Sequence, residues 1–107
     1  MFILVPVIAH GAAELTPGEM RTVYLGDRAV LLVNLEGTFH ALDDTCTHGE
    51  CSLGEGYLDG AIVECPCHGA TFDVCTGAAL TLPATVPVCV YPVRVTSATD
   101  LQIDLPS

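Results

Sequence analysis

The chain has 107 residues, a length typical of one domain, so we expect residues 1–107 to form a single domain. Thirteen acidic residues against three basic ones give a formal net charge of −10, which argues against nucleic acid or an anionic membrane surface as a partner. Half of the residues are hydrophobic, enough for a dense core, and a metal centre would further stabilise so short a chain.

The first half of the chain predicts short strands joined by turns. Residues 2–8 are apolar and predict a first strand, either buried or at a sheet edge. Residues 21–25 and 29–35 predict a hairpin across Gly26-Asp27, a strong turn signal. The second of these strands is a continuous apolar run and is therefore expected to be central. Residues 38–42 predict the next strand and lead toward the first of two unusual loops.

The second half continues the pattern of short strands. Residues 53–60 are rich in glycine and predict a turn-like segment, and residues 62–64 and 71–74 predict two short strands. Residues 88–96 and 101–105 predict a closing hairpin, in which Pro92 forces an edge or a bulge. No segment has helical periodicity or caps. The sequence therefore predicts an all-β fold.

Two short motifs provide candidate metal ligands. The first is Cys46-Thr47-His48 and the second is Cys65-Pro66-Cys67-His68, so each motif offers one thiolate and one imidazole. A zinc ion could bind all four side chains, but structural zinc sites usually group like ligands together. Mixing one Cys and one His in each loop suits a two-iron, two-sulfide cluster, with both Cys on one iron and both His on the other.

With the following glycines, the two motifs read Cys46-Thr47-His48-Gly49 and Cys65-Pro66-Cys67-His68-Gly69, and they resemble the Rieske iron–sulfur family. Within that family the chain is most similar to the small ferredoxins of bacterial aromatic-ring-hydroxylating dioxygenases. The resemblance covers about residues 20–105 and includes the segments 52–56, 57–60, 72–77 and 90–95.

The resemblance implies a fold, a cofactor and its ligands. The implied fold is an antiparallel β-barrel or sandwich base, into which a small cluster-binding subdomain of about residues 44–76 is inserted. The implied cofactor is one [2Fe-2S] cluster held by Cys46, His48, Cys65 and His68. A proline-bearing loop, here within residues 79–87, is expected to cover the cluster.

The same resemblance implies an electron carrier and not an enzyme. The expected partners are an NAD(P)H-dependent ferredoxin reductase and a terminal oxygenase, which would dock near His48 and His68. Four acidic residues near the loops are candidates either for that docking face or for simple solvation: Glu50, Glu55, Asp59 and Glu64. Residues 1–9 are too short to cross a bilayer and lack a basic leader region, so the expected compartment is the cytoplasm. An acidic monomer is the default expectation for the oligomeric state.

Two positions after the second motif predict the reduction potential. High-potential Rieske proteins carry Ser and Tyr two and four residues after the second ligand His, and their hydroxyls donate hydrogen bonds that stabilise the reduced state. This chain has Ala70 and Phe72 there, and neither side chain can donate. The prediction is a low potential, near about −150 mV.

Four cysteines remain outside the proposed ligand set. Cys51 and Cys67 stand where Rieske proteins of cytochrome bc complexes carry a disulfide that clamps the two loops, which the ring-hydroxylase ferredoxins generally lack. A bridge is therefore left open, because a reducing cytoplasm opposes it. Cys75 and Cys89 are expected to be small buried hydrophobic residues.

Several polar residues receive ordinary structural roles. His10 and His40 lie outside the motifs and are expected to be surface or strand histidines. Asp73 is expected to brace the second loop. Three threonines could hydrogen-bond the loop backbone: Thr45, Thr47 and Thr71.

Three alternative functions remain open. One is the small Rieske subunit of a nitrite reductase, which the ligands alone do not distinguish from a dioxygenase ferredoxin. Another is a high-potential subunit of a respiratory or arsenite-oxidising complex, which Cys51 and Cys67 favour and Ala70 and Phe72 oppose. The last is a zinc-stabilised binding module, which would be colourless and redox-silent.

Overall fold

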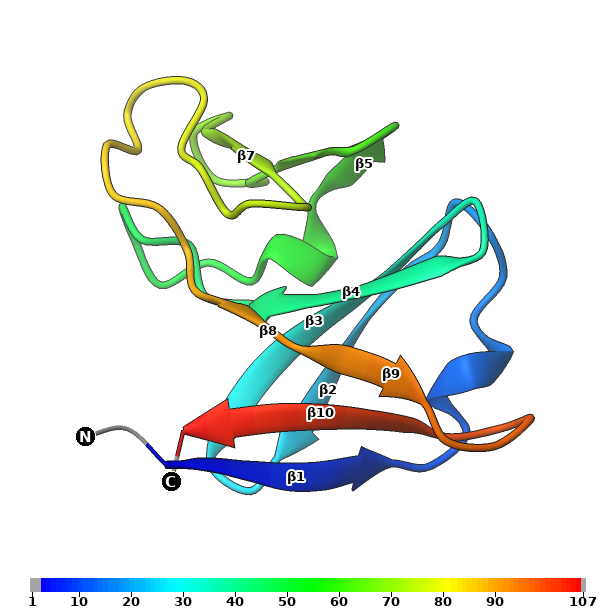
Figure 1. Ribbon diagram of the computed structural model, residues 1–107. Helices are drawn as coiled ribbons and strands as arrows, with labels where there is room; N and C mark the ends of the chain where they lie inside the picture. Colours follow the sequence, from blue (N-terminus) through cyan, green and yellow to red (C-terminus); the bar gives the residue numbers. More distant parts are fainter. Residues whose placement is uncertain (1–2, 107) are drawn as a thin grey trace.

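The computed structural model describes residues 3–106 and contains three antiparallel sheets (Figure 1). A four-stranded sheet has the order β2-β3-β4-β8, a three-stranded sheet has the order β1-β10-β9, and a second three-stranded sheet has the order β5-β6-β7. The strands are β1 Leu4–Ala9, β2 Met20–Leu25, β3 Arg28–Leu35, β4 Thr38–Asp43, β5 Tyr57–Asp59, β6 Ile62–Glu64, β7 Thr71–Asp73, β8 Val90–Tyr91, β9 Val93–Val95 and β10 Leu101–Pro106. The predicted all-β fold is confirmed.

Strand β3 is central, as its apolar run predicts, and it buries side chains on both faces. Successive residues of a strand point to opposite faces, so the run divides into two sets. Leu31 and Val33 join the core beneath the two loops, whereas Val30 and Leu32 join the core against the β1-β10-β9 sheet. All four side chains are fully buried. The continuous run is therefore explained by two cores that share one strand.

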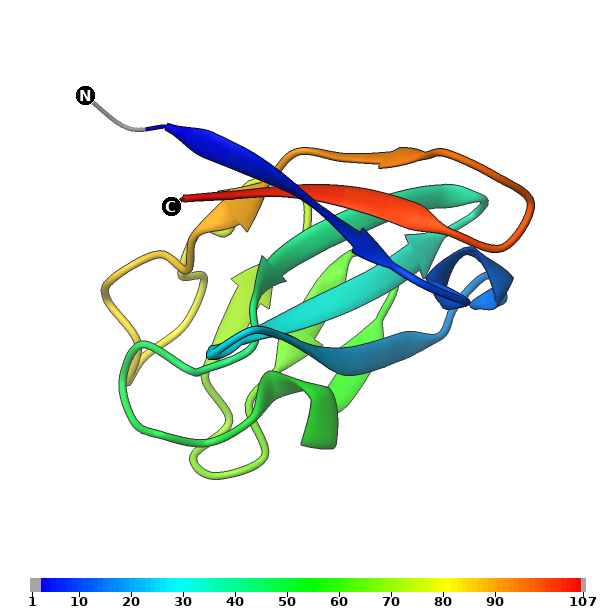
Figure 2. The same cartoon turned by 90° about the horizontal axis from the view of Figure 1, so that it is seen from below.

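The segment predicted as one strand over residues 88–96 is divided between two sheets. Val90 and Tyr91 pair with β4, and Val93–Val95 pair with β10. Pro92 lies at the break, because its ring nitrogen has no hydrogen to donate to a ladder. Figure 2 shows β1 and β10 running across the face of the four-stranded sheet, which this division of the segment permits.

The first predicted strand is an edge strand. Leu4–Ala9 pairs only with β10, and most of its residues are exposed. The predicted strand also included Phe2, which lies outside the described residues. The hairpin across Gly26-Asp27 is confirmed, with Leu25 opposite Arg28.

The glycine-rich segment 53–60 contains more structure than predicted. It holds a 3-10 turn, Leu53–Glu55, and strand β5, which pairs with β6. A second 3-10 turn spans Ala12–Glu14. Strand β5 was not predicted because three residues are too few to show alternation. Among residues 3–106, no helix is long and apolar enough to cross a membrane.

Candidate metal centre

The two motif loops are closed by the same backbone pattern. In the first loop the N–H of Cys46 donates to the carbonyl of Cys51 at 2.9 Å, and in the second the N–H of Cys65 donates to the carbonyl of Ala70 at 2.8 Å. Each Cys carbonyl also accepts an N–H from the glycine that ends its motif, Gly49 or Gly69, at 3.2 Å. Gly69 has a φ of +75°, a left-handed conformation that glycine adopts at little cost. Both loops therefore turn tightly and present their side chains to one centre.

The four predicted ligands come together at that centre. The ligand atoms of Cys46, His48 and Cys65 all lie within 4.8 Å of one another. The Sγ of Cys46 lies 3.5 Å from the Nδ1 of His48. The rings of His48 and His68 are edge to face, with centroids 4.8 Å apart. Two residues from each loop thus lie near one another, and two sulfur atoms with two imidazoles are the donor types that a Rieske cluster takes.

The sulfur atoms and the imidazoles differ in burial. Cys46 and Cys65 are 2% and 0% exposed, whereas His48 is half-buried and His68 is exposed. Burial raises the pKa of the Cys46 thiol, because a thiolate loses its hydration there, and the neighbouring Cys65 also raises this pKa. The backbone N–H groups of His48 and Gly49 lower it, but burial is the largest effect. Residues 44–76 contain no Lys or Arg to offset a buried thiolate. The cation of a metal centre would supply that charge, so the donor set fits an iron–sulfur cluster.

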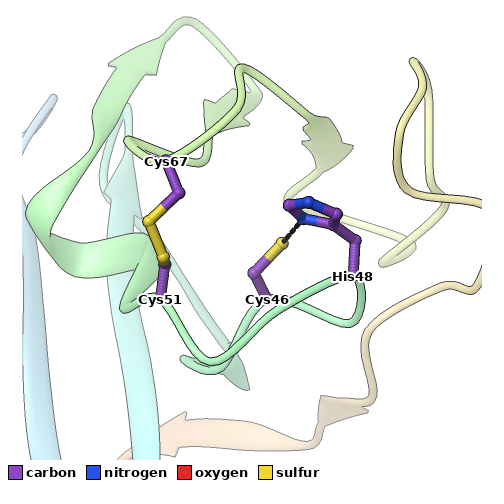
Figure 3. Close-up of a disulfide and its surroundings, with 4 residues drawn as sticks. All are labelled: Cys46, His48, Cys51 and Cys67. Atoms are coloured by element: carbon purple, nitrogen blue, oxygen red, sulfur yellow. Dashed lines mark hydrogen bonds between the residues drawn. A yellow bond between two sulfur atoms is a disulfide. The ribbon is translucent and has the colours of Figure 1, made fainter.

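A disulfide joins the two loops. Cys51 and Cys67 are bonded, with their Cα atoms 6.4 Å apart, and Figure 3 shows this bond beside the Cys46–His48 pair. The bridge that the sequence left open is therefore present in the structure. It links the end of the first loop to the middle of the second, so the loops are joined independently of any metal.

The proline-bearing segment, residues 79–87, lies against both loops. The hydroxyl of Thr47 donates to the carbonyl of Val86 at 2.6 Å. The hydroxyls of Thr71 and Thr81 are 2.9 Å apart, and the N–H of Leu80 donates to the carbonyl of Thr71 at 2.8 Å. The segment exposes three apolar side chains: Leu80, Leu82 and Val86. Threonines 47 and 71 thus anchor this segment to both loops.

Asp44 is a positioning residue that the sequence did not predict. Its side chain is almost fully buried, and its Oδ1 accepts hydrogen bonds of 2.8 Å from the Thr22 hydroxyl and from the Gly54 N–H. The Leu53 N–H also donates to the Asp44 carbonyl at 2.7 Å. Asp44 therefore holds both ends of the first loop and ties it to β2. The only signal in the sequence is an acidic residue two positions before the first ligand.

The remaining predicted residues are placed as follows. The carboxylate of Asp73 accepts the N–H groups of Cys75 and Thr76, so its structural role is in the turn after β7, whereas the sequence predicted that it braces the second loop. His10 is exposed and bonds Asp100, and His40 lies on β4, so both are outside the centre. The four acidic residues near the loops are all exposed: Glu50, Glu55, Asp59 and Glu64.

The predicted burial of two cysteines is wrong. Cys75 and Cys89 are both exposed. Cys89 lies just before β8, between Val88, which is buried, and Val90, which is exposed. Cys75 lies in the turn that Asp73 braces, beyond the end of β7. Apolar neighbours in the sequence therefore did not predict the burial of these two side chains.

Comparison with known proteins identifies a family. Residues 5–92 match the model of the Rieske [2Fe-2S] domain. The 3-phenylpropionate/cinnamic acid dioxygenase ferredoxin subunit of Shigella boydii is 53% identical over 78 residues, which are 72% of this chain and 73% of the relative. Ferredoxin CarAc of Metapseudomonas resinovorans is 48% identical over 85 residues, which are 78% of this chain and 79% of the relative.

Solved structures agree with this similarity. A chain in the complex of reduced oxygenase and oxidized ferredoxin of carbazole 1,9a-dioxygenase is 38% identical, with a TM-score of 0.84 over 92% of each chain. The putative NADH-dependent nitrite reductase small subunit of Mycobacterium tuberculosis is 29% identical, with a TM-score of 0.80 over 96% of each chain.

Proposed function

Because this chain belongs to the Rieske [2Fe-2S] domain family, we propose that it is the ferredoxin of an aromatic-ring-hydroxylating dioxygenase system. It carries single electrons from an NAD(P)H-dependent ferredoxin reductase to a terminal oxygenase. The observation that carries the proposal is the convergence of two matching loops on one centre of two buried sulfur atoms and two outer imidazoles. The dioxygenase ferredoxin subunit that it resembles at 53% identity, and the chain of the carbazole 1,9a-dioxygenase complex at 38% identity, support the choice of system.

Cys46, His48, Cys65 and His68 hold the cluster in this proposal. The cluster would be held by Cys46 and Cys65 on its buried side and by His48 and His68 on the side closer to solvent. When bound, the group supplies a one-electron couple, with a potential raised by its neutral imidazole ligands. The chain's own part is to exclude water from the sulfur side and to bring the imidazole side close to solvent, where a partner can approach.

The face around His48 and His68 is the proposed docking site. Beside the two loops, the proline-bearing segment exposes Leu80, Leu82 and Val86, which are 46%, 77% and 57% exposed. Apolar side chains at the centre of an interface exclude water, while charges around them steer the encounter. With a net charge of −10, this protein would be attracted to a partner that places basic residues around an apolar patch.

A low potential is part of the proposal. Ala70 and Phe72 are both fully buried in the core that also contains Cys46 and Cys65. Neither side chain can donate a hydrogen bond to a sulfur atom there. A low potential suits electron delivery from a nicotinamide-dependent reductase, and it opposes the high-potential respiratory or arsenite-oxidising alternative.

The nitrite reductase small subunit remains the second candidate, supported by the similarity to the Mycobacterium tuberculosis protein at 29% identity. The higher identity to dioxygenase ferredoxins favours the first candidate.

We further propose a single domain whose cluster-binding subdomain spans about residues 44–76, and a cytoplasmic monomer. The Cys51–Cys67 bond counts against the cytoplasmic location, because disulfides are rare in the reducing cytosol. Cell fractionation with thiol labelling, and sedimentation of the purified protein, test these two points.

The test is a redox titration of the purified protein combined with an electron-transfer assay. We expect a one-electron wave near about −150 mV and reduction of a dioxygenase terminal oxygenase, driven by NADH and a ferredoxin reductase. Cys65→Ser should lose the iron and the wave, whereas Cys89→Ser, at an exposed cysteine outside the centre, should keep both. A wave near about +100 to +300 mV would contradict the ferredoxin role, and zinc without a wave would contradict the cluster.

A further inference from the structure

Outside the metal centre, the structure brings an exposed thiol next to an imidazole. The Sγ of Cys75 lies 4.0 Å from the Nε2 of His40, although the two residues are 35 positions apart. Both are held on ordered backbone. Asp73 accepts the Cys75 N–H at 2.8 Å, and His40 lies opposite Val33 in the β3-β4 ladder. The fold therefore places the two backbone positions so that the thiol and the imidazole can meet.

The pair lies on the wall of a groove of about 720 Å³ between the β5-β6-β7 sheet and the four-stranded sheet. Leu58 and Ala61 line it on one side, and Leu35 and Thr38 line it on the other. The volume is within the range of small-molecule sites. Two acidic residues lie nearby: Glu36 lines the same groove, and the carboxylate of Asp73 accepts the Cys75 N–H.

Metal binding does not explain the pair. Among residues 3–106, His40 and Cys75 join no third His, Cys, Asp or Glu in a group that could hold an ion. Two ligands alone are too few for the usual coordination of zinc. A thiol within reach of an imidazole is instead the arrangement that activates a cysteine nucleophile, since the ring nitrogen can accept the thiol proton.

We propose that Cys75 is a modification site that reacts with low-molecular-weight disulfides of the glutathione type, with His40 as its proton acceptor. The Cys75 sulfur attacks one sulfur of the small disulfide, so a Cys75–S bond forms and the disulfide's own S–S bond breaks. Cys75 is oxidised to a mixed disulfide, and the departing half is reduced to a thiol, which takes the proton from His40. The attached group then occupies the groove. This chemistry is independent of the proposed electron carrier.

The chain contains its own matched control. Cys89 is also exposed and free, but within residues 3–106 its thiol has no hydrogen-bond partner and lines none of the described grooves. Cys46 and Cys65 are buried, and Cys51 and Cys67 are already bonded to each other. Exposure alone therefore predicts equal reactivity of Cys75 and Cys89, whereas the His40 contact predicts that Cys75 is faster.

The experiment compares the two thiols in the cluster-loaded protein. Cys89→Ser and Cys75→Ser are incubated with glutathione disulfide at neutral pH, quenched with acid and followed by intact mass. We expect the Cys89→Ser protein, which retains Cys75, to form the adduct on the order of tenfold faster. Adding His40→Gln to Cys89→Ser should remove most of that advantage, and adding His10→Gln, at an exposed histidine bonded to Asp100, should not.

The visible spectrum of each variant checks that the fold and the cluster are intact. Should His40→Gln disturb it, His40→Asn is the replacement. A rate ratio below about threefold between the two single variants, or between His40→Gln and its parent, overturns the proposal. Larger ratios in both comparisons support it. Because the redox titration is a separate measurement, failure here leaves the proposed electron carrier untouched.

Discussion

The disulfide between Cys51 and Cys67 closes a 16-residue separation that contains Cys65 and ends one residue before His68. Its two halves come from different loops, and each loop also provides one buried sulfur and one imidazole. The loops are therefore cross-linked twice, once by the disulfide and once by the proposed cluster.

The double cross-link predicts that removing the disulfide affects the metal-free protein most. A disulfide loop of this size lowers the conformational entropy of the unfolded chain and so stabilises the fold by about 3 kcal/mol, but a cluster still bonded to Cys46 and Cys65 in the unfolded chain imposes much of the same constraint. Cys51→Ser with Cys67→Ser should therefore lower the free energy of unfolding by about 3 kcal/mol without metal and by clearly less with it. Urea unfolding of both forms measures this. Equal losses in the two forms would contradict it, and Cys75→Ser with Cys89→Ser serves as control.

The absence of hydroxyl donors at Ala70 and Phe72 predicts how the potential is set. In Ala70→Ser, a new donor beside the second loop should stabilise the reduced state by about 1 kcal/mol, which corresponds to roughly 40 mV upward for one electron. Phe72→Tyr should act in the same direction. Voltammetry provides the measurement. Ala84→Ser, at a buried position of the same core but outside the second loop, is the control and should leave the potential unchanged.

The exposed apolar side chains beside the loops predict a docking phenotype. Leu82→Ser should raise the KM of the terminal oxygenase for this protein on the order of tenfold, because an apolar contact at the centre of an interface is lost. The reduction potential should not change. Tyr24→Ser, at a similarly exposed position on β2, should leave KM as it is. Equal effects of the two substitutions would remove the docking face from this segment.

Buried Asp44 predicts a large loss of stability. Asp44→Ala leaves the Thr22 hydroxyl and the Gly54 N–H without their acceptor, which should cost about 2–4 kcal/mol in the free energy of unfolding. Iron content should also fall, because the first loop loses its anchor. Denaturant unfolding and iron analysis measure the two effects. Asp59→Ala, at an exposed position, should leave iron content unchanged and shift the free energy of unfolding by no more than about 0.5 kcal/mol.

A pH effect is expected at Asp100, just before β10 and outside the metal centre. The Gly11 N–H, with His10 and Thr99, holds the pKa of Asp100 below its ordinary value of about 3.9. A lowered pKa means that the unfolded chain binds the proton more tightly, so this stabilisation is present above about pH 4 and is lost as the pH falls through the folded-state pKa. Asp100→Asn should therefore be less stable than the parent at neutral pH, with the difference shrinking below about pH 4. A difference that is constant with pH would contradict the assignment.

The sequence by itself determined the chemistry and the class of fold. The alternation of Cys and His in two short motifs requires only local spacing, so Cys46, His48, Cys65 and His68 are recognisable from the order of residues alone. Strands and hairpins with strong local signals, such as β3 and the turn at Gly26-Asp27, are predictable for the same reason. These features depend on neighbours in the chain.

Tertiary structure decided what depends on distant partners. The role of Asp44 rests on Thr22 and Gly54, and the contact of Cys75 rests on His40, none of which is near in sequence. The exposure of Cys89 depends on how the segment before β8 packs, and the Cys51–Cys67 bond follows from two loops brought face to face. Burial and pairing are properties of packed surfaces, and packing joins residues that composition and local spacing cannot relate to one another.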